Sequence, residues 1–271
     1  MGLRYLGGKD EALRLGLREQ LITRARAHAR GTNRGVRFFD LFCGSGKVTL
    51  AMEGLHAARF AADASAPVVC LLRALRDGWS PPEALSYDLW RALRQQAKAV
   101  GLLGVNARAI ECDPIIAFAG FACSRNGAFF RGFQYDPATV AAAARSALKL
   151  GEDLRRLNIS IQLADYRMAF RDVVGVEDST TAFGPGDVVY CDIPYDGTAT
   201  YATAPKFNAC AFWRWAVRVA RRGALVLVSE YGAPPVGVEV WRCARTVRVR
   251  RLNVGRKGAP TVIEKLYEVV A

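Results

Sequence analysis

The residues from Asp187 to Tyr195, Asp-Val-Val-Tyr-Cys-Asp-Ile-Pro-Tyr, join an apolar run to a carboxylate, a proline and an aromatic ring. This pattern predicts a buried strand with a polar site at its carboxyl end, where open α/β sheets bind ligands. Asp192 and the Ile193 carbonyl can each accept one N–H of an exocyclic amine on a flat ring. Pro194 fixes the turn, and Tyr195 offers a stacking face. Alternatively, Asp192 caps the next turn and Tyr195 packs in the core.

Two further predicted strands also end in carboxylates. Residues 57–62 lead into Asp63, and residues 159–163 lead into Asp165 and Tyr166. If each acid only capped the helix that follows it, the acids would not need to stand at the same place after each strand. We therefore expect the carboxylates to meet at one edge of a parallel sheet.

A glycine loop follows the first apolar strand, in the sequence Asp40-Leu-Phe-Cys-Gly-Ser-Gly46. Such a loop lets the backbone pass close beneath a bound ligand. Thr49 and Leu50 stand where the dinucleotide fingerprint has its third glycine, which disfavours a nicotinamide enzyme. Asp63 lies 17 residues after Gly46, a place where an acid commonly binds ribose hydroxyls, although capping of the next helix would also explain it.

The residues from Tyr5 to Lys9 form a glycine turn that ends in a lysine. Backbone amides and an ammonium in such a turn can approach an anion, but glycine-lysine pairs also occur in ordinary loops. A helix is expected after the turn, because Leu13, Leu17 and Leu21 recur at four-residue spacing.

Residues 66–158 have a mostly helical pattern that is too long for one crossover between parallel strands. We therefore expect an inserted helical subdomain there, with residues 1–65 and 159–271 forming the main domain. Within it, residues 121–133 interleave arginines, aromatics and glycines, which suits phosphate contact by Arg125, Asn126 and Arg131 together with base stacking. The alternative is a hydrophobic loop that packs on the core.

The composition indicates a basic globular protein. The chain has 271 residues, a net charge of +13 and 51% hydrophobic residues. The charge suits a polyanion, most simply nucleic acid, although a basic enzyme with a small anionic substrate remains an alternative. Residues 242–257 carry only basic charges, and Arg248 and Arg250 alternate along an expected strand, so we expect both to contact phosphates.

Cysteine and histidine usage argues against a disulfide scaffold and a metal site. Seven cysteines include no C-x-x-C pair, and the two histidines do not cluster with them. The first residues lack the apolar core of a signal peptide, so we expect none, and no long uncharged apolar run occurs. We expect a cytoplasmic protein with reduced thiols, no metal and no membrane association.

Taken together, these motifs resemble those of the Dam-type adenine-N6 DNA methyltransferases over nearly the whole chain. The Gly-Gly-Lys start is similar to Tyr5 to Lys9, the Phe-x-Gly-x-Gly loop to Phe42 to Gly46, and the catalytic Asp-Pro-Pro-Tyr motif to Asp192 to Tyr195. The chain has Ile193 where the family usually has proline. Isoleucine keeps the backbone carbonyl, but it loosens the turn and adds an N–H that needs a partner.

The resemblance implies a fold, a cofactor and a reaction. The fold is an α/β, Rossmann-like S-adenosylmethionine-dependent methyltransferase sheet with a helical target-recognition insert. The reaction is direct methyl transfer from S-adenosylmethionine to adenine N6 in double-stranded DNA. The resemblance also implies an enzyme of the restriction-modification kind that is a monomer or a weak dimer. Cys191 would take no part, because it points away from Asp192 on a strand. A DNA-binding relic without turnover and a methyltransferase for cytosine N4, RNA or a protein amide are alternatives.

The resemblance also implies the site residues. The catalytic positions are Asp192, Ile193, Pro194 and Tyr195. The cofactor-binding positions are Tyr5, Lys9, Asp40, Phe42, Gly44, Gly46, Asp63, Asp165, Tyr166 and Asp192.

Overall fold

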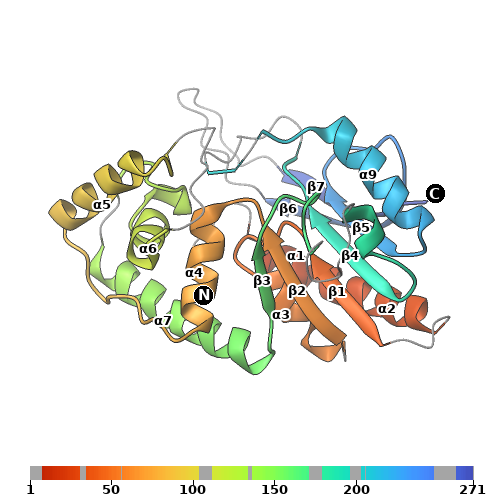
Figure 1. Ribbon diagram of the computed structural model, residues 1–271, viewed down its shortest axis with the longest axis horizontal. Helices are drawn as coiled ribbons and strands as arrows, with labels where there is room; N and C mark the ends of the chain where they lie inside the picture. The colour runs from red at the N-terminus through yellow and green to blue at the C-terminus, as the bar shows by residue number, and fades with distance from the viewer. Residues whose placement is uncertain are drawn as a thin grey trace.

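A seven-stranded mixed sheet organises the protein in a computed structural model (Figure 1). The structure describes residues 8–30, 35–55, 57–103, 112–133, 136–170, 179–195, 203–204, 206–246 and 261–270. The sheet order is β3-β2-β1-β4-β5-β7-β6. In chain order the strands are β1 (Val36–Asp40), β2 (Ala57–Asp63), β3 (Ser160–Leu163), β4 (Asp187–Asp192), β5 (Leu225–Glu230), β6 (Val238–Thr246) and β7 (Thr261–Glu268).

Strands β1 to β5 run parallel, and β7 is antiparallel to both β5 and β6. The strand order reverses between β1 and β4, so the loops after these two strands diverge and open a crevice at their carboxyl ends. The α/β sheet predicted from the sequence is confirmed, including the strands that end in Asp63 and Asp192.

Alternating side chains divide the core between the two faces of the sheet. In β1, Phe38 packs with the helices of one face and Phe39 with those of the other; in β4, Val188 and Val189 divide in the same way. This alternation follows from the period of two in a strand. Both faces are apolar because helices cover both, as parallel sheets require.

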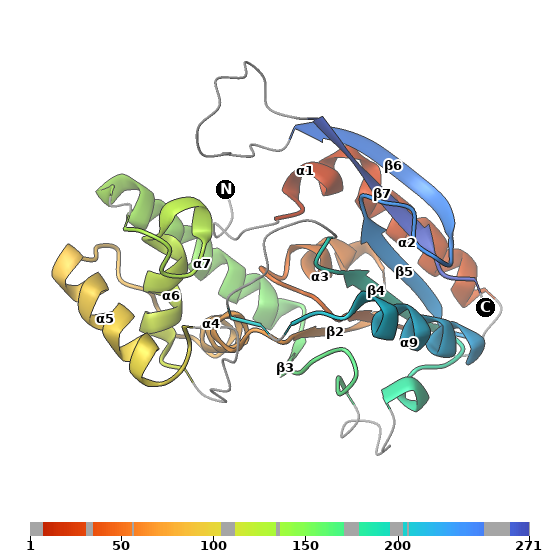
Figure 2. The same cartoon turned by 90° about the horizontal axis from the view of Figure 1, so that it is seen from above.

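Helices from opposite ends of the chain cover the two faces (Figure 2). The first face packs against α1 (Asp10–Ala12), a kinked segment (Leu13–Leu17), α2 (Arg18–Ala29) and α3 (Lys47–Ala51). The opposite face packs against α9 (Ala209–Arg221), whose apolar side buries Phe212 and Trp215. The expected N-terminal helix is interrupted at Gly16, which has a φ of 110°.

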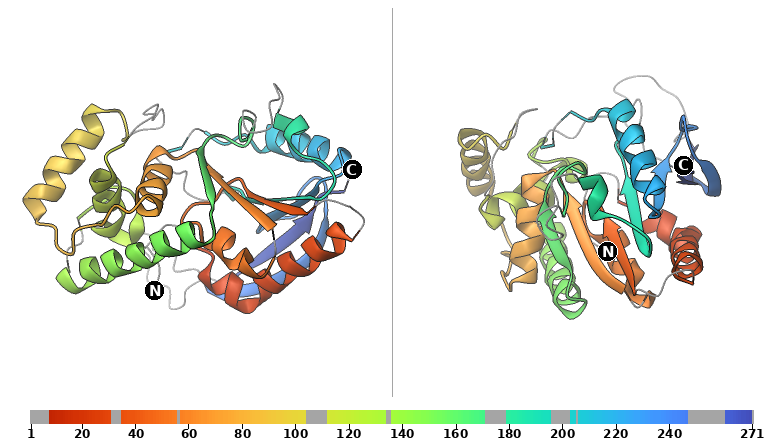
Figure 3. Two further views of the ribbon diagram at one scale, coloured as in Figure 1. Left: turned by 60° about the horizontal axis from the view of Figure 1, so that its bottom comes forward. Right: turned by 45° about the vertical axis from the view of Figure 1, so that its right-hand side comes forward.

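The remaining helices lie together beside β3 (Figure 3). They are α4 (Ala66–Arg76), α5 (Tyr87–Ala99), α6 (Pro114–Ala122) and α7 (Pro137–Arg156). Their buried side chains form one cluster that extends to the sheet at Ala61 and Ile161. At the closest approach of α4 and α7, a Cβ on Gly151 would lie 2.4 Å from the Leu75 carbonyl oxygen, so glycine is required there. In the described part of the chain, no helix is long and apolar enough to cross a membrane.

Candidate active site

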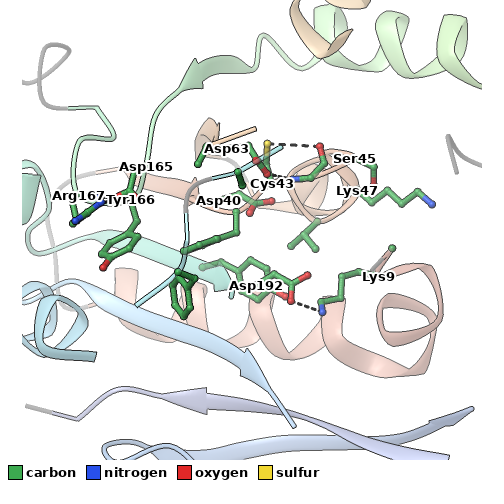
Figure 4. A pocket seen from close by; sticks show the side chains of 18 of the residues that line it. Lys9, Asp40, Cys43, Ser45, Lys47, Asp63, Asp165, Tyr166, Arg167 and Asp192 are labelled. Carbon is green, nitrogen blue, oxygen red and sulfur yellow. Dashed lines mark hydrogen bonds and ion pairs between the residues drawn. The ribbon is translucent and has the colours of Figure 1, made fainter. Parts of the chain in front are cut away.

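A cavity lies at the carboxyl ends of β1, β2, β3 and β4 (Figure 4). It brings together most of the residues that the sequence nominated for cofactor binding. Those that line it are Lys9, Asp40, Phe42, Gly44, Asp63, Asp165, Tyr166 and Asp192. Gly46 and Ile193 are chain neighbours of lining residues but do not themselves line the cavity, and neither do Pro194 and Tyr195, which follow Ile193. Tyr5 lies outside the described residues.

The glycine loop forms one wall of the cavity. Gly44 and Gly46 adopt positive φ angles of 49° and 74°, which glycine adopts without strain. The Gly44 N–H donates to Oδ2 of Asp63 at 2.9 Å, and the Ser65 N–H donates to Oδ1 of the same carboxylate at 2.8 Å. Asp63 therefore holds the glycine loop and the approach to α4 while it faces the cavity. Burial, the largest cause, raises the pKa of Asp63 to about 6.

Asp40, the last residue of β1, is 1% exposed and lines the cavity. Thr49 Oγ1 donates to its Oδ2 at 2.8 Å, whereas its Oδ1 has no hydrogen-bond partner among the described residues. Burial raises the pKa of Asp40 to about 7, and the nearby Asp192 and Asp63 charges act in the same direction. A buried carboxylate oxygen without a partner at a cavity wall is suited to a ligand that brings a donor or a positive charge.

The third strand-end carboxylate, Asp165, lies on the opposite wall with its neighbours. Its side chain accepts from the backbone N–H and the Nε of Arg167, at 2.9 and 2.7 Å. Tyr166 is buried, and its ring stacks on Phe42 with centroids 5.9 Å apart. This part of the cavity therefore combines a carboxylate with aromatic surfaces, a combination that suits a flat polar ring.

The corner after β4, predicted from the sequence to be catalytic, contains a buried charge cluster. The Lys9 ammonium lies 2.5 Å from Oδ1 of Asp192 and 2.7 Å from Oε1 of Glu264 on β7. The Tyr195 hydroxyl accepts from Lys9 and lies 2.8 Å from Oδ1 of Asp192 and 3.2 Å from Oε1 of Glu264. Lys9 thus contacts the predicted catalytic carboxylate directly. Glu264 is a functional candidate that no motif in the sequence indicated.

Burial and the neighbouring charges shift the pKa values of both Lys9 and Asp192. Burial alone lowers the pKa of Lys9, but the carboxylates of Asp192 and Glu264 outweigh it and the pKa is raised. For Asp192, burial raises the pKa and Glu264 adds to this, whereas Lys9 and Tyr195 oppose it. Both contacts to Asp192 use Oδ1, so among the described residues Oδ2 is the oxygen available to an amine in the cavity.

In the region predicted to contact DNA, the arginines are exposed and most of the aromatic residues are buried. Arg125 and Arg131 are exposed at a turn closed by a bridge between Ser124 and Phe133. The aromatic residues of this stretch do not form a stacking surface: Phe121, Phe129 and Phe130 are buried in the helical cluster, as the alternative of a hydrophobic loop required. The side chain of Asn126 lies outside the described part of the chain, as do Arg248 and Arg250.

Two buried cysteines lie at or beside this site: Cys43 lines the cavity, where burial raises the pKa of its thiol well above the usual range, and Cys191 precedes Asp192 on β4. Cys191 is fully buried in the α9-side cluster, on the face opposite to Tyr190, and burial raises the pKa of its thiol well above the usual range. All seven cysteines are free thiols, and no group of ligands for a metal ion occurs among the described residues.

Comparisons with known proteins give likenesses to solved structures. No protein-family model and no curated protein matches the chain. One similar structure, the rRNA methyltransferase aviRa from Streptomyces viridochromogenes, has 18% identity and a TM-score of 0.38, over 94% of this chain and 84% of that one. A SAM-dependent methyltransferase from Agrobacterium tumefaciens has 11% identity and a TM-score of 0.43, over 94% of this chain and 62% of that one. Because both TM-scores are below 0.5, neither likeness assigns an activity to this chain.

Proposed function

We propose that this chain is an S-adenosylmethionine-dependent methyltransferase that methylates the N6 amine of adenine in DNA. The observation that carries the proposal is the cavity in which Asp40, Asp63, Asp165 and Asp192 meet the glycine loop. Four carboxylates around one cavity are suited to a ligand that combines positive charge with hydroxyl and amine donors. S-adenosylmethionine has all of these groups, and it supplies an electrophilic methyl group when bound.

The individual residues fit the parts of this cofactor. Asp63 is positioned to accept from the ribose hydroxyls, and Asp165 beside the Phe42 and Tyr166 rings is positioned for the adenine. Asp40 supplies a partnerless buried oxygen for the positively charged part. The glycine turn before Lys9 was expected to approach an anion; the structure instead supports a role for Lys9 at Asp192.

The catalytic corner can activate an aromatic amine. The lone pair of such an amine is delocalised into its ring, so two acceptors aimed at its N–H groups favour a nitrogen that can attack a methyl group. Oδ2 of Asp192 and the Ile193 carbonyl are the acceptors in this proposal, and Ile193 acts through its backbone. Positioning and these acceptors provide most of the acceleration.

Nucleic acid is the proposed substrate because of charge and resemblance. The net charge of +13 and the exposed Arg125 and Arg131 suit a phosphate backbone. The target base must leave the duplex to reach a cavity of this kind, which costs a few kcal/mol. Adenine in DNA is favoured over cytosine or RNA by the order and spacing of motifs shared with the Dam-type enzymes.

The test is nucleoside mass spectrometry. Unmethylated DNA and RNA are incubated separately with the protein and methyl-deuterated S-adenosylmethionine, and Asp192→Asn, which keeps the shape of the side chain, is the control. Labelled N6-methyladenine from DNA with the unmodified protein alone is the expected result. Label on N4-methylcytosine or in RNA would show that the acceptor is not adenine in DNA. No label in any nucleoside would refute nucleic-acid methylation.

A further inference from the structure

Glu264 on β7 is buried in a way that sheet packing alone does not explain. It is 0% exposed, whereas its apolar neighbour Ile263 is 44% exposed. The usual arrangement of a strand that packs on a core is the reverse, with the apolar residue inside. Burial of a carboxylate is costly unless it is paired, so its partners show what the charge stabilises.

Strand geometry places Glu264 on the same side of the sheet as Asp192. Leu266, two residues further along β7, packs in the cluster under α1 to α3, and so does Tyr190, two residues before Asp192. Because alternate residues of a strand share a face, Glu264 and Asp192 both point to that face. Lys9, which directly precedes α1, lies between the two carboxylates and contacts both.

We propose that Glu264 is a positioning residue that acts through Lys9 and Tyr195 to orient Asp192 and to set its basicity. This inference rests on the proposed methyl transfer. Glu264 holds the ammonium and the hydroxyl against Oδ1 of Asp192, and Oδ2 is thereby turned to the substrate amine. Without Glu264 the ammonium would be paired with Asp192 alone.

The same arrangement provides for the proton that the reaction releases. As the amine nitrogen bonds to the methyl carbon, the carbon–sulfur bond breaks and its electron pair stays on sulfur. The nitrogen then carries a positive charge and loses one proton. Two carboxylates share one ammonium in the cluster, so Asp192 keeps enough basicity to take that proton, which it could not do as easily in a neutral ion pair.

The charged and titratable groups around Asp192 all bear on this basicity. They are Lys9, Asp40, Asp63, Tyr190, Tyr195 and Glu264. Among them, Glu264 raises and Lys9 lowers the pKa of Asp192. Removal of the Glu264 charge should therefore make Asp192 titrate at lower pH.

The experiment follows Asp192 directly by carbon-13 NMR of labelled aspartate carboxyl groups, with Asp192→Asn to identify its signal. In Glu264→Gln, which keeps the side-chain shape, the titration of Asp192 should move to lower pH. Glu268→Gln, on the same strand but paired with Arg24, is the matched control and should leave it in place. Turnover in E264Q should fall on the order of tenfold, with the KM for S-adenosylmethionine nearly unchanged. This loss is smaller than the roughly 100-fold or larger contribution of a whole acid–base group, because Asp192 itself is retained.

The NMR readout separates this inference from the proposed function, because it needs no turnover. An unchanged Asp192 titration in folded E264Q would overturn the positioning role even if the protein methylates DNA. A shifted titration in a protein that methylates no nucleic acid would support the coupling and refute the reaction. If E264Q does not fold, Glu264→Asp withdraws the carboxylate from Lys9 while keeping its charge, and an unchanged Asp192 titration in that variant would equally refute the role.

Discussion

The backbone N–H of Gly44 donates to Oδ2 of Asp63 across 2.9 Å, so the glycine loop after β1 is tied directly to the acid that ends β2. The other oxygen of Asp63 accepts the Ser65 N–H just before α4. One carboxylate therefore ties the glycine loop to the start of α4. The proposed binding role of Asp63 is compatible with this structural role, because each oxygen of an ionised carboxylate has two lone pairs and can accept from a ligand as well.

The first prediction concerns Asp63→Asn. The amide has one acceptor oxygen, so one of the two backbone donors or a ribose hydroxyl loses its partner. Hydrogen bonds to charged groups are worth about 1.5 to 3 kcal/mol, which corresponds to a roughly 10- to 100-fold weaker affinity for S-adenosylmethionine. Calorimetric titration measures this change, and DNA affinity should stay within about twofold. An equal loss of DNA affinity would contradict the assignment of Asp63 to the cofactor.

The sheet and its strand-end carboxylates could be predicted because each depends on local pattern. Apolar runs that end in Asp63, Asp165 and Asp192 indicate parallel strands, and the carboxyl ends of such strands lie at one edge whatever the details of packing. The glycine loop was predictable for a similar reason, since Gly44 and Gly46 adopt backbone angles that few other residues tolerate.

The cluster at Asp192 and the packing of residues 121–133 depended on contacts between distant parts of the chain. Glu264 meets Lys9 only because β7 inserts antiparallel between β5 and β6, an arrangement that local pattern does not specify. The sequence signal for Glu264 was weak, because an acid directly after the apolar pair Val262 and Ile263 does not indicate its partner. Likewise, Phe129 and Phe130 are buried because they fold back on Gly120, where a Cβ would lie 2.3 Å from the Phe129 ring.

The second prediction concerns the pH dependence of stability through Asp40. Its pKa in the folded protein is raised to about 7 from 3.8, so the folded state binds the proton more tightly than the unfolded state. The folded state is therefore favoured below pH 4, and this contribution is lost as the pH rises through about 7. Asp40→Asn removes that loss and keeps an acceptor for Thr49.

We therefore expect Asp40→Asn to match the unmodified protein in stability at pH 4 and to exceed it at pH 8. A shift of about three pKa units corresponds to at most about 4 kcal/mol. Urea unfolding of both proteins at the two pH values measures the difference. A variant that is less stable than the unmodified protein at pH 8 would show that ionised Asp40 has a stabilising partner.

The third prediction compares S-adenosylmethionine with its demethylated product, S-adenosylhomocysteine, which lacks the sulfonium charge. Asp63 and Asp40 ionise with pKa values of about 6 and about 7, so the cavity gains negative charge between pH 5 and pH 8. Affinity for the sulfonium compound should rise on the order of tenfold over that range, a size consistent with Coulomb attraction at a few ångströms in a partly screened site. The product should change less, and Asp40→Asn should reduce the difference. If the affinities of both ligands changed with pH in the same way, the sulfonium group would not bind close to Asp40 and Asp63.

The fourth prediction concerns Ile193→Ala. The Ile193 side chain is 3% exposed and packs in the α9-side cluster, so truncation should lower the free energy of unfolding by about 2 to 4 kcal/mol. Its backbone carbonyl, the proposed acceptor, is retained. The rate of methyl transfer at a temperature where the variant is folded should fall less than tenfold, whereas Asp192→Asn should abolish transfer. A loss as large as that of D192N would assign the isoleucine side chain itself to the catalytic geometry.

The fifth prediction tests the exposed arginines of the 124–133 turn. Each Lys or Arg that neutralises a DNA phosphate contributes about 0.9 to the slope of log affinity against log salt. Replacement of both Arg125 and Arg131 by alanine should therefore reduce the slope by up to about 1.8. Fluorescence anisotropy of labelled DNA at salt concentrations from about 50 to about 200 mM measures the slope. Replacement of both Arg221 and Arg222 by alanine, at the end of α9 on the other side of the molecule (Figure 1), removes the same charge, is the matched control and should leave the slope unchanged. An equal effect of both replacements would indicate that DNA responds to net charge alone, since a local contact requires the turn.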